Sequence, residues 1–426
     1  MKKFLALIIA LVMALSLVAC GEQKQPDNND VPDDGQQTAT VKVGFITLHD
    51  ENSTYDLNFI NAAKEAIANL GLTDADYILK TNVPEGQECY ETAMNLVDEG
   101  CNIIFADSFG HEPYMIDAAK EHPEVQFCHS TGTRAHTENL ANYHNAFASI
   151  YEGRYLAGIA AGLKLNEMIE AGKFTADEAK MGYVGAFTYA EVVSGYTSFF
   201  LGARSVCPTV TMDVTFTGSW YDETLEKEGA EKLIQGGCKL ISQHADSLGA
   251  PTACENAGVP NVSYNGSTKD SCPNTFIVSS RIDWAPYYEM CIKAVMDGTE
   301  IPADWTGTLA TGSVVLTDVN ETAAAAGTAE AIAAATEKLE KGEIHVFDCA
   351  NFTTKVDDKV NTFKADYLKL DEAGHITSYM ADVDTDAAYT GDTEVIKDGY
   401  FAESEFRSAP YFDLQIDGIN LLDTAM

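Results

Sequence analysis

The sequence predicts an α/β protein with two doubly wound parallel-sheet lobes that face each other across a ligand cleft. Two observations support this fold class. Strand-like and helix-like segments alternate from residue 41 to residue 264, and the alternation follows one pattern in both halves. Strict alternation of strand and helix gives parallel sheets that helices cover on both faces. Two halves of one design therefore predict two such sheets.

The first strand and helix show the two periods most clearly. Residues 41–47 form an apolar run typical of a buried strand, and from Tyr55 apolar side chains recur at helical spacing until Gly71 ends the helix. The same reading applies along the chain. It predicts helices at 90–99, 113–122, 150–169, 191–206, 222–235 and 250–257, and strands at 102–106, 125–128, 181–187, 209–216, 239–243 and 261–264.

Two distant stretches carry the same motif. Residues 96–108 and 233–247 each contain a helix end, a Gly-Cys turn, a strand and a final Ala-Asp-Ser. Upstream, residues 54–56 (Thr-Tyr-Asp) and 220–222 (Trp-Tyr-Asp) each open a helix. Because open parallel sheets bind ligands at the carboxyl ends of their strands, the paired motifs predict one shared cleft. The alternative is that Asp and Ser recur as helix caps.

The N-terminal segment has the three parts of an export signal. Lys2 and Lys3 precede an apolar run from Phe4 to Leu15, too short for a membrane-spanning helix, and Leu-Val-Ala-Cys20 follows. This ending is a lipobox, in which the Cys20 thiol takes a diacylglyceryl group and the chain is cut before it. We predict a signal peptide at 1–20 and a protein lipid-anchored on the extracytoplasmic face of the cell membrane. The alternative is an ordinary cleaved signal with a chance cysteine.

Composition narrows the choice of partners. Residues 21–40 are polar and predict a disordered tether, because they cannot bury enough apolar surface to fold. The rest is long enough for two or three domains, and the chain is 46% hydrophobic, as real cores require. The formal net charge of −38 argues against nucleic acid and anionic lipid surfaces as partners, since like charges repel. We expect a monomer.

Nine cysteines follow Cys20 without the spacing of a zinc site, so we expect no metal. Most lie in apolar patterns, where cysteine acts as a small core residue, and a disulfide such as Cys254 with Cys272 stays open. The motifs of serine hydrolases, P-loops, zinc peptidases and dinucleotide-binding turns are absent, so we expect neither an enzyme nor a cofactor. The enzymatic alternative is a nucleosidase with Asp107 and Asp246 as paired carboxylates.

Several longer motifs follow one another in order. They are Ile150-Tyr-Glu-Gly-Arg-Tyr-Leu-Ala-Gly158, Gly182-Tyr-Val-Gly-Ala-Phe187, Glu191-Val-Val-Ser-Gly195, Phe200-Leu-Gly-Ala-Arg-Ser205, Gln243-His-Ala-Asp-Ser247, Tyr264-Asn265 and Trp284-Ala-Pro-Tyr-Tyr288. Together they resemble the basic membrane protein (BMP) family of ABC-transporter substrate-binding lipoproteins, over about residues 41–342.

This resemblance implies the type I periplasmic-binding-protein fold, with two lobes joined by three crossovers. It also implies a purine base or nucleoside as the small-molecule ligand and an ABC permease as the membrane partner. On this basis we place an N-terminal lobe at 41–150, to which part of 272–342 returns, a C-terminal lobe at 151–271 and an extension at 343–426. The functional alternative is a surface receptor that senses a ligand without a transport role.

The signatures at 54–55, 108–110 and 220–221 are similar to the family branch associated with free purine bases. Asn52-Ser53 stands where that branch often has Gly-Trp, which leaves the exact ligand open. A flat ring buries its faces against other rings, so Tyr55 and Trp220, with Phe109 and Tyr221 in reserve, are the stacking candidates. For hydrogen bonds to the ligand we expect Ser108, Asp246, Asn265 and Asp283, with Glu191 as a further candidate. Gly110 is a ligand-binding candidate through the signature at 108–110.

Three further residues carry alternatives. Glu191 opens its predicted helix, where an acidic side chain also complements the helix dipole. Phe109 has core packing as its alternative, and core packing is what we expect for Trp284.

In the extension we expect strand-like segments at 345–348 and 367–370, a turn-like acidic stretch at 382–392, and ordered content that ends with 407–413. These features predict a small β-rich appendage, packed on a lobe and without a site of its own. Asp382, Asp384 and Asp386 lack the Gly and the final Glu of an EF-hand, which favours a solvated loop over a calcium site.

Overall fold

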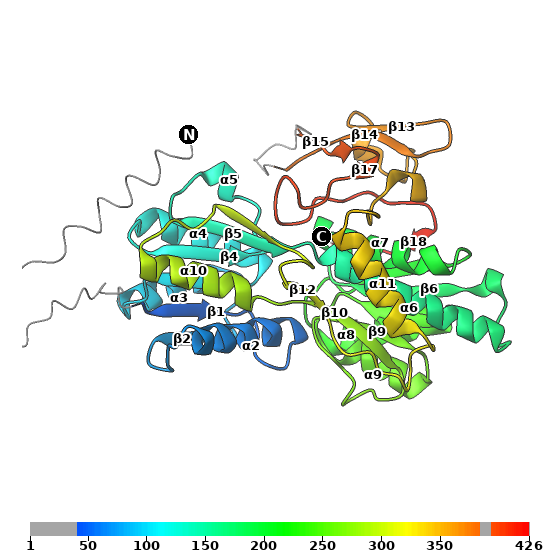
Figure 1. Ribbon diagram of the computed structural model, residues 1–426, viewed down its shortest axis with the longest axis horizontal. Helices are drawn as coiled ribbons and strands as arrows, with labels where there is room; N and C mark the ends of the chain where they lie inside the picture. Colours follow the sequence, from blue (N-terminus) through cyan, green and yellow to red (C-terminus); the bar gives the residue numbers. More distant parts are fainter. Residues whose placement is uncertain (1–40, 384–392, 426) are drawn as a thin grey trace, which may run out of the picture. The chain divides into compact units, whose positions relative to one another are not determined.

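The protein is described from a computed structural model, in which residues 41–383 and 393–425 are described (Figure 1). The predicted signal peptide, Cys20 and the predicted tether lie outside the described residues, as do Asp384 and Asp386 of the acidic stretch. The described chain forms two large sheets, both mostly parallel, and small antiparallel sheets near the C-terminus. The predicted α/β fold with two parallel-sheet lobes is confirmed.

The N-terminal lobe contains a six-stranded sheet in the order β11-β5-β4-β3-β1-β2, with parallel pairing throughout. Its strands are β1 (Val43–Ile46), β2 (Tyr77–Lys80), β3 (Ile103–Ala106), β4 (Gln126–Ser130), β5 (Tyr143–Ala148) and β11 (Asp304–Gly307). Its helices are α2 (Thr54–Asn69), α3 (Gln87–Asp98), α4 (Glu112–Glu121), the short α5 (Ala135–Glu138) and α10 (Ala285–Asp297).

Helices cover both faces of this sheet because successive side chains of a strand point to opposite faces. Val43 and Phe45 pack in the core that contains α2 and α10, whereas Ile46 packs in the core that contains α3 and α4. Every residue of β1 is therefore buried, which explains why its sequence is a nearly continuous apolar run.

The C-terminal lobe contains a seven-stranded sheet in the order β12-β10-β9-β8-β6-β7-β18, in which only the β10–β12 pairing is antiparallel. Its strands are β6 (Lys180–Gly185), β7 (Thr211–Phe216), β8 (Leu240–Gln243), β9 (Asn261–Tyr264), β10 (Phe276–Ile282), β12 (Val314–Leu316) and β18 (Ile419–Leu421). Its helices are α6 (Ile150–Glu170), α7 (Ala190–Val206), α8 (Glu223–Gln235) and α9 (Gly249–Ala257).

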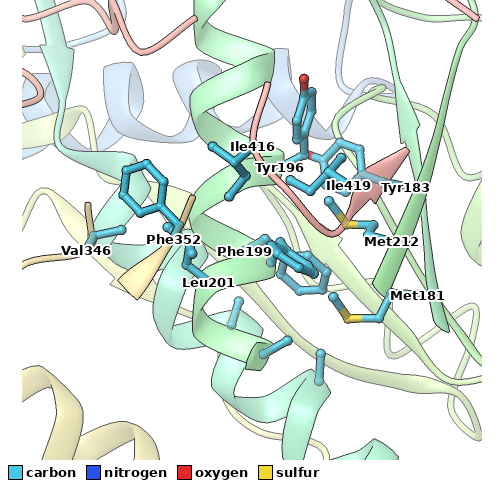
Figure 2. Packing of buried hydrophobic residues seen from close by; sticks show 14 of the residues in the cluster. Met181, Tyr183, Tyr196, Phe199, Leu201, Met212, Val346, Phe352, Ile416 and Ile419 are labelled. Carbon is cyan, nitrogen blue, oxygen red and sulfur yellow. The ribbon is translucent and has the colours of Figure 1, made fainter. Parts of the chain in front are cut away.

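Helices α6 and α7 touch through their backbones. A Cβ atom at Gly158 would lie 2.0 Å from the carbonyl oxygen of Phe199, and one at Gly202 would lie 2.0 Å from that of Tyr155. Only glycine permits so close an approach, which gives a physical reason for the small residues in both motifs. Beyond these contacts, α7 packs on the sheet through Phe199, near Met181 and Met212 (Figure 2).

The chain crosses between the two sheets three times within the described residues. It crosses from β5 to α6, from β10 to α10, and from β11 to β12. The part of 272–342 that returns to the N-terminal lobe is therefore α10 with β11. Three crossings are what the family resemblance implies.

The repeated motif has one geometry in both lobes. Cys101 N donates to Leu96 O over 2.9 Å, and Cys238 N donates to Leu233 O over 3.1 Å. The glycines before these cysteines have φ values of +89° and +93°, which residues other than glycine rarely adopt. The repeat is thus a helix stop followed by a buried strand, β3 in one lobe and β8 in the other.

The extension differs from its prediction in two places. Residues 345–348 do not form a strand, and Asp348 makes only an isolated bridge to Tyr400. Order does not end at 413, because β18 pairs in parallel with β7 and adds a strand to the large sheet. The β-rich part is otherwise β13 (Leu368–Leu370), β14 (Ile376–Ala381), β15 (Thr393–Glu394), β16 (Ile396–Lys397) and β17 (Tyr400–Phe401), preceded by helix α11 (Thr328–Glu340).

The extension shares its core with the C-terminal lobe. Val346, Phe352 and Ile416 pack in the same cluster as Phe199 and Leu201 of α7 (Figure 2).

The nine cysteines among the described residues are all buried and unpaired, so Cys254 and Cys272 form no disulfide. Most cysteines therefore act as small core side chains, as expected.

Trp284 is a core residue. Its ring is 1% exposed and stacks on Phe59 of α2 with the ring centroids 4.5 Å apart. We expect Trp284→Ala to lower the free energy of unfolding by about 3–5 kcal/mol, because it leaves a cavity between α2 and α10. Urea unfolding measures this, with Phe363→Ala at a 92% exposed position as the control that changes it by no more than about 0.5 kcal/mol. Equal effects of the two substitutions would contradict the core assignment.

Candidate ligand-binding site

A pocket lies where the strands of both sheets end. Three of its walls consist of residues that follow β1, β3 and β4 of the N-terminal lobe. The other walls consist of residues of the C-terminal lobe that follow β7 and β8 or lie at the start of α7. The space between the lining atoms, open solvent included, is about 340 Å³. The lining residues are Leu48, His49, Tyr55, Asp56, Ser108, Phe109, Thr131, Glu191, Trp220, His244 and Asp246.

The two lobes touch around this pocket. Thr54 N donates to Asp246 O across the cleft over 3.1 Å. The rings of Phe109 and Tyr189 stack from opposite lobes with centroids 5.2 Å apart. These contacts describe a closed arrangement in which both lobes would reach one ligand.

Aromatic side chains supply apolar walls. Trp220 lies against Phe187, with ring centroids 5.0 Å apart, and is half-buried. Tyr55 is held by two contacts: its hydroxyl donates to Asp107 O over 2.7 Å, and its ring packs edge-on against Phe59. Both rings are therefore oriented before any ligand enters.

Asp246 is a buried acceptor on the same wall as Trp220. Its backbone N donates to Trp220 O over 3.0 Å, and its carboxylate accepts from Asn265 Nδ2 over 3.3 Å. Burial raises the pKa of Asp246 well above its usual range, and the nearby Asp56 and Glu226 carboxyls add to the shift. A ligand N–H or O–H donor would relieve the cost of this buried group.

A buried relay orients Glu191. Arg154 Nη2 donates to the Tyr183 hydroxyl over 2.6 Å, and that hydroxyl lies 3.4 Å from His244 Nδ1. Because a guanidinium can only donate, the Tyr183 hydrogen is free to point at Nδ1. On the other side of the ring, His244 Nε2 lies 3.3 Å from Glu191 Oε1. Glu191 therefore lines the pocket with its carboxylate held in place by His244.

Two residues at this pocket have an unusual backbone conformation. Thr131, at the end of β4, has φ +73°, a rare value for a β-branched residue. Its buried Oγ1 has no hydrogen-bond partner. Asn265, behind Asp246, has φ +65°. Strain of this kind persists where the surrounding structure enforces it, and it is typical of functional sites.

The structure brings together six of the ten predicted ligand-binding residues: Tyr55, Ser108, Phe109, Glu191, Trp220 and Asp246 line the pocket. The other four lie outside its lining. Asn265 contacts Asp246, and the Tyr221 ring lies over His49 at 5.3 Å. Gly110 N donates to Glu85, and Asp283 accepts from Ala285 N at the start of α10.

Five residues that line the pocket were not among the predicted ligand-binding residues. Leu48, His49 and Thr131 follow the carboxyl ends of predicted strands, which is the signal that could have found them. Asp56 and His244 lay within quoted motifs but were not chosen. Asp56 and Asp222, which occupy matching motif positions, also differ: Asp222 caps α8, whereas Asp56 faces the pocket.

Other chemistries find little support in the described residues. Asp107, one carboxylate of the nucleosidase alternative, does not line the pocket, and it accepts from Leu48 N over 3.1 Å. Over 41–383 and 393–425, no three His, Cys, Asp or Glu side chains gather as metal ligands. Over the same residues, no helix combines the length and apolar character needed to cross a membrane.

Comparison with known proteins places the chain in one family. The Bmp family profile, described as ABC transporter substrate-binding protein PnrA-like, matches residues 45–348. A purine-binding protein of Brucella abortus is 32% identical over 262 residues, 61% of this chain and 70% of that protein. A putative ABC transporter glucose-binding protein of Haloferax volcanii is 34% identical over 207 residues, 48% of this chain and 49% of that protein.

Solved structures support the same fold. An ABC transporter solute-binding protein from Conexibacter woesei superposes with a TM-score of 0.58 at 20% identity, over 72% of this chain and 98% of that one. The likeness shows the fold, and the profile match over residues 45–348 shows the family. The protein therefore belongs to the Bmp family of ABC transporter substrate-binding proteins, which bind a solute and are not enzymes.

Proposed function

We propose that this protein binds a purine base or nucleoside in the pocket between its lobes and delivers it to an ABC importer. The observation that carries the proposal is the pairing of Trp220 with the buried Asp246 on one wall, opposite Tyr55. A purine has flat faces that stack on aromatic rings and an edge with N–H donors for a carboxylate. The purine-binding relative supports the same ligand class.

Delivery follows from lobe closure. A ligand that contacts both lobes favours the closed arrangement, and closure creates the surface that a membrane permease reads. The cross-lobe contacts of Thr54 with Asp246 and of Phe109 with Tyr189 are the contacts that opening would break. A sensing receptor would close in the same way, so transport is tested by uptake and not by binding.

The proposed location rests on the N-terminal motif. Lipidation of Cys20, followed by the polar residues 21–40, would hold the folded lobes near the permease on a tether.

A ligand panel tests the proposed function. We expect adenine, guanine or one of their nucleosides to raise the melting temperature, because only the closed form contacts ligand with both lobes. At a hundredfold excess over Kd the stabilisation is about 2.7 kcal/mol. Glucose belongs in the panel because of the Haloferax relative. No shift with any purine at millimolar concentration would contradict the purine proposal, and a shift with glucose alone would replace it.

Two substitutions test the pocket wall. We expect Trp220→Ala to weaken purine binding by roughly 1–3 kcal/mol, tenfold or more in Kd, through lost stacking. Asp246→Asn keeps the shape but removes the carboxylate, and we expect a loss of about 1–3 kcal/mol. Calorimetric titration measures both losses.

The control for these variants is Trp305→Ala. Trp305 lies on β11, outside the pocket, so its loss leaves Kd unchanged. Asp246→Asn also removes a carboxyl that other carboxyls repel, so we expect no fall in the unfolding free energy of the free protein. Wild-type affinity in both pocket variants would show that the ligand binds elsewhere.

A separate substitution tests the lipid anchor. Cys20→Ala removes the thiol that would carry the lipid, so we expect the protein to leave the membrane fraction or to stay unprocessed. Cell fractionation with immunoblotting measures this, and Cys101→Ala, at a buried core cysteine, is the matched control. A processed Cys20→Ala protein that stays in the membrane fraction would refute the anchor.

A further inference from the structure

A second cavity adjoins the ligand pocket. It lies between both lobes and the C-terminal extension, and the space among its lining residues, open solvent included, is about 810 Å³. Phe109, Thr131 and Glu191 line both cavities, so the two are neighbours across these three side chains. The extension contributes Arg407, Ala409, Pro410 and Asp413, all beyond residue 348, where the family match ends.

The extension wall is held in place from both lobes. Ser408 N donates to Asp304 Oδ2 of the N-terminal lobe over 2.7 Å. Glu403 O accepts from the Tyr151 hydroxyl of α6, and Glu403 Oε2 accepts from Phe412 N over 2.9 Å. A segment pinned at both ends presents a fixed surface, which is what a specificity wall requires.

The cavity mixes donors and acceptors. Arg407 is 5% exposed, and its guanidinium donates to the carbonyls of Ala409 and Pro410 over 3.1 and 2.9 Å. Helix α7 begins here, and its N-cap Tyr189 makes no side-chain cap bond, so first-turn N–H groups remain as donors. Glu191 is an acceptor, Asp413 is paired with Lys364 and accepts from the Tyr379 hydroxyl, and the buried Thr131 Oγ1 has no partner.

We propose that residues 403–413 of the extension form one wall of a second ligand compartment, which takes a hydroxyl-bearing substituent such as the sugar of a nucleoside. Hydroxyl groups both donate and accept, so they match a mixed wall. A phosphate would meet the carboxylate of Glu191, and a plain hydrocarbon would leave Thr131 unpaired. The proposal rests on the proposed function and adds a preference to it: the protein binds a nucleoside more tightly than the free base.

Filling the compartment from two opposite walls tests this. Ala409→Leu adds volume from the extension, and Ala190→Leu adds it from the start of α7; neither residue lines the first pocket. Ala409→Ser is the control that keeps the volume. Titration calorimetry of the full chain with adenine, adenosine and adenosine monophosphate gives Kd, and stopped-flow fluorescence gives both rate constants.

We expect the wild type to bind adenosine most tightly of the three ligands. Each Leu variant should lose tenfold or more in adenosine affinity, with adenine affinity within twofold of wild type and Ala409→Ser unchanged. If Ala190→Leu has the effect and a folded Ala409→Leu does not, the extension is no part of the site. Equal losses for adenine and adenosine would also overturn the proposal.

Two further outcomes separate the alternatives. Slower association and dissociation with unchanged Kd would show that the cavity is an entry route, and tightest wild-type binding of adenosine monophosphate would show an anion site; either overturns the proposal. A wild type that binds neither base nor nucleoside contradicts the proposed function itself. Wild-type purine binding that both Leu variants leave intact contradicts only the second compartment.

Discussion

The burial of mutually repelling carboxyl groups between the lobes is the constraint on which the rest of the site depends. Asp246 lies close enough to Asp56 and Glu191 for their charges to raise its pKa, and no lysine or arginine forms an ion pair with these carboxyls among the described residues. Closing the cleft without a ligand therefore has an electrostatic cost. A ligand with several donors lowers that cost, so ligand chemistry and lobe closure are coupled.

The fold supplies this constraint through strand direction. Parallel pairing brings the carboxyl ends of β1, β3 and β4 to one edge, and those of β6 and β8 to the facing edge. The residues that follow these strands then meet, although they are far apart in sequence. The buried Arg154 donates to the Tyr183 hydroxyl, which lies beside His244 behind Glu191.

Sequence reasoning reached what local patterns encode. The Gly-Cys repeat identified β3 and β8, and so placed Ser108 and Asp246 at one site, because a helix stop before a buried strand leaves a signature. The strand predicted at His345 to Asp348 was wrong because two apolar side chains in a loop can be buried as fully as those of a strand, although the backbone makes only an isolated bridge. Thr131 was not chosen, although it follows a predicted strand, because the sequence pattern does not show its strained backbone. Asp283 lies outside the pocket lining and accepts from Ala285 N at the start of α10.

The extension, which follows the residues that the family profile matches, adds a constraint of its own. It is fused to the C-terminal lobe through β18 and through Val346, Phe352 and Ile416, yet it reaches the N-terminal lobe at Asp304. Opening the cleft must therefore break or shift the Ser408–Asp304 contact, while the contacts to α7 and β7 stay. A segment that moves with one lobe and bonds to the other in the closed form favours closure, and this same segment lines the second cavity. If the two proposals hold, residues 403–413 would contact both the ligand and the facing lobe in the closed form.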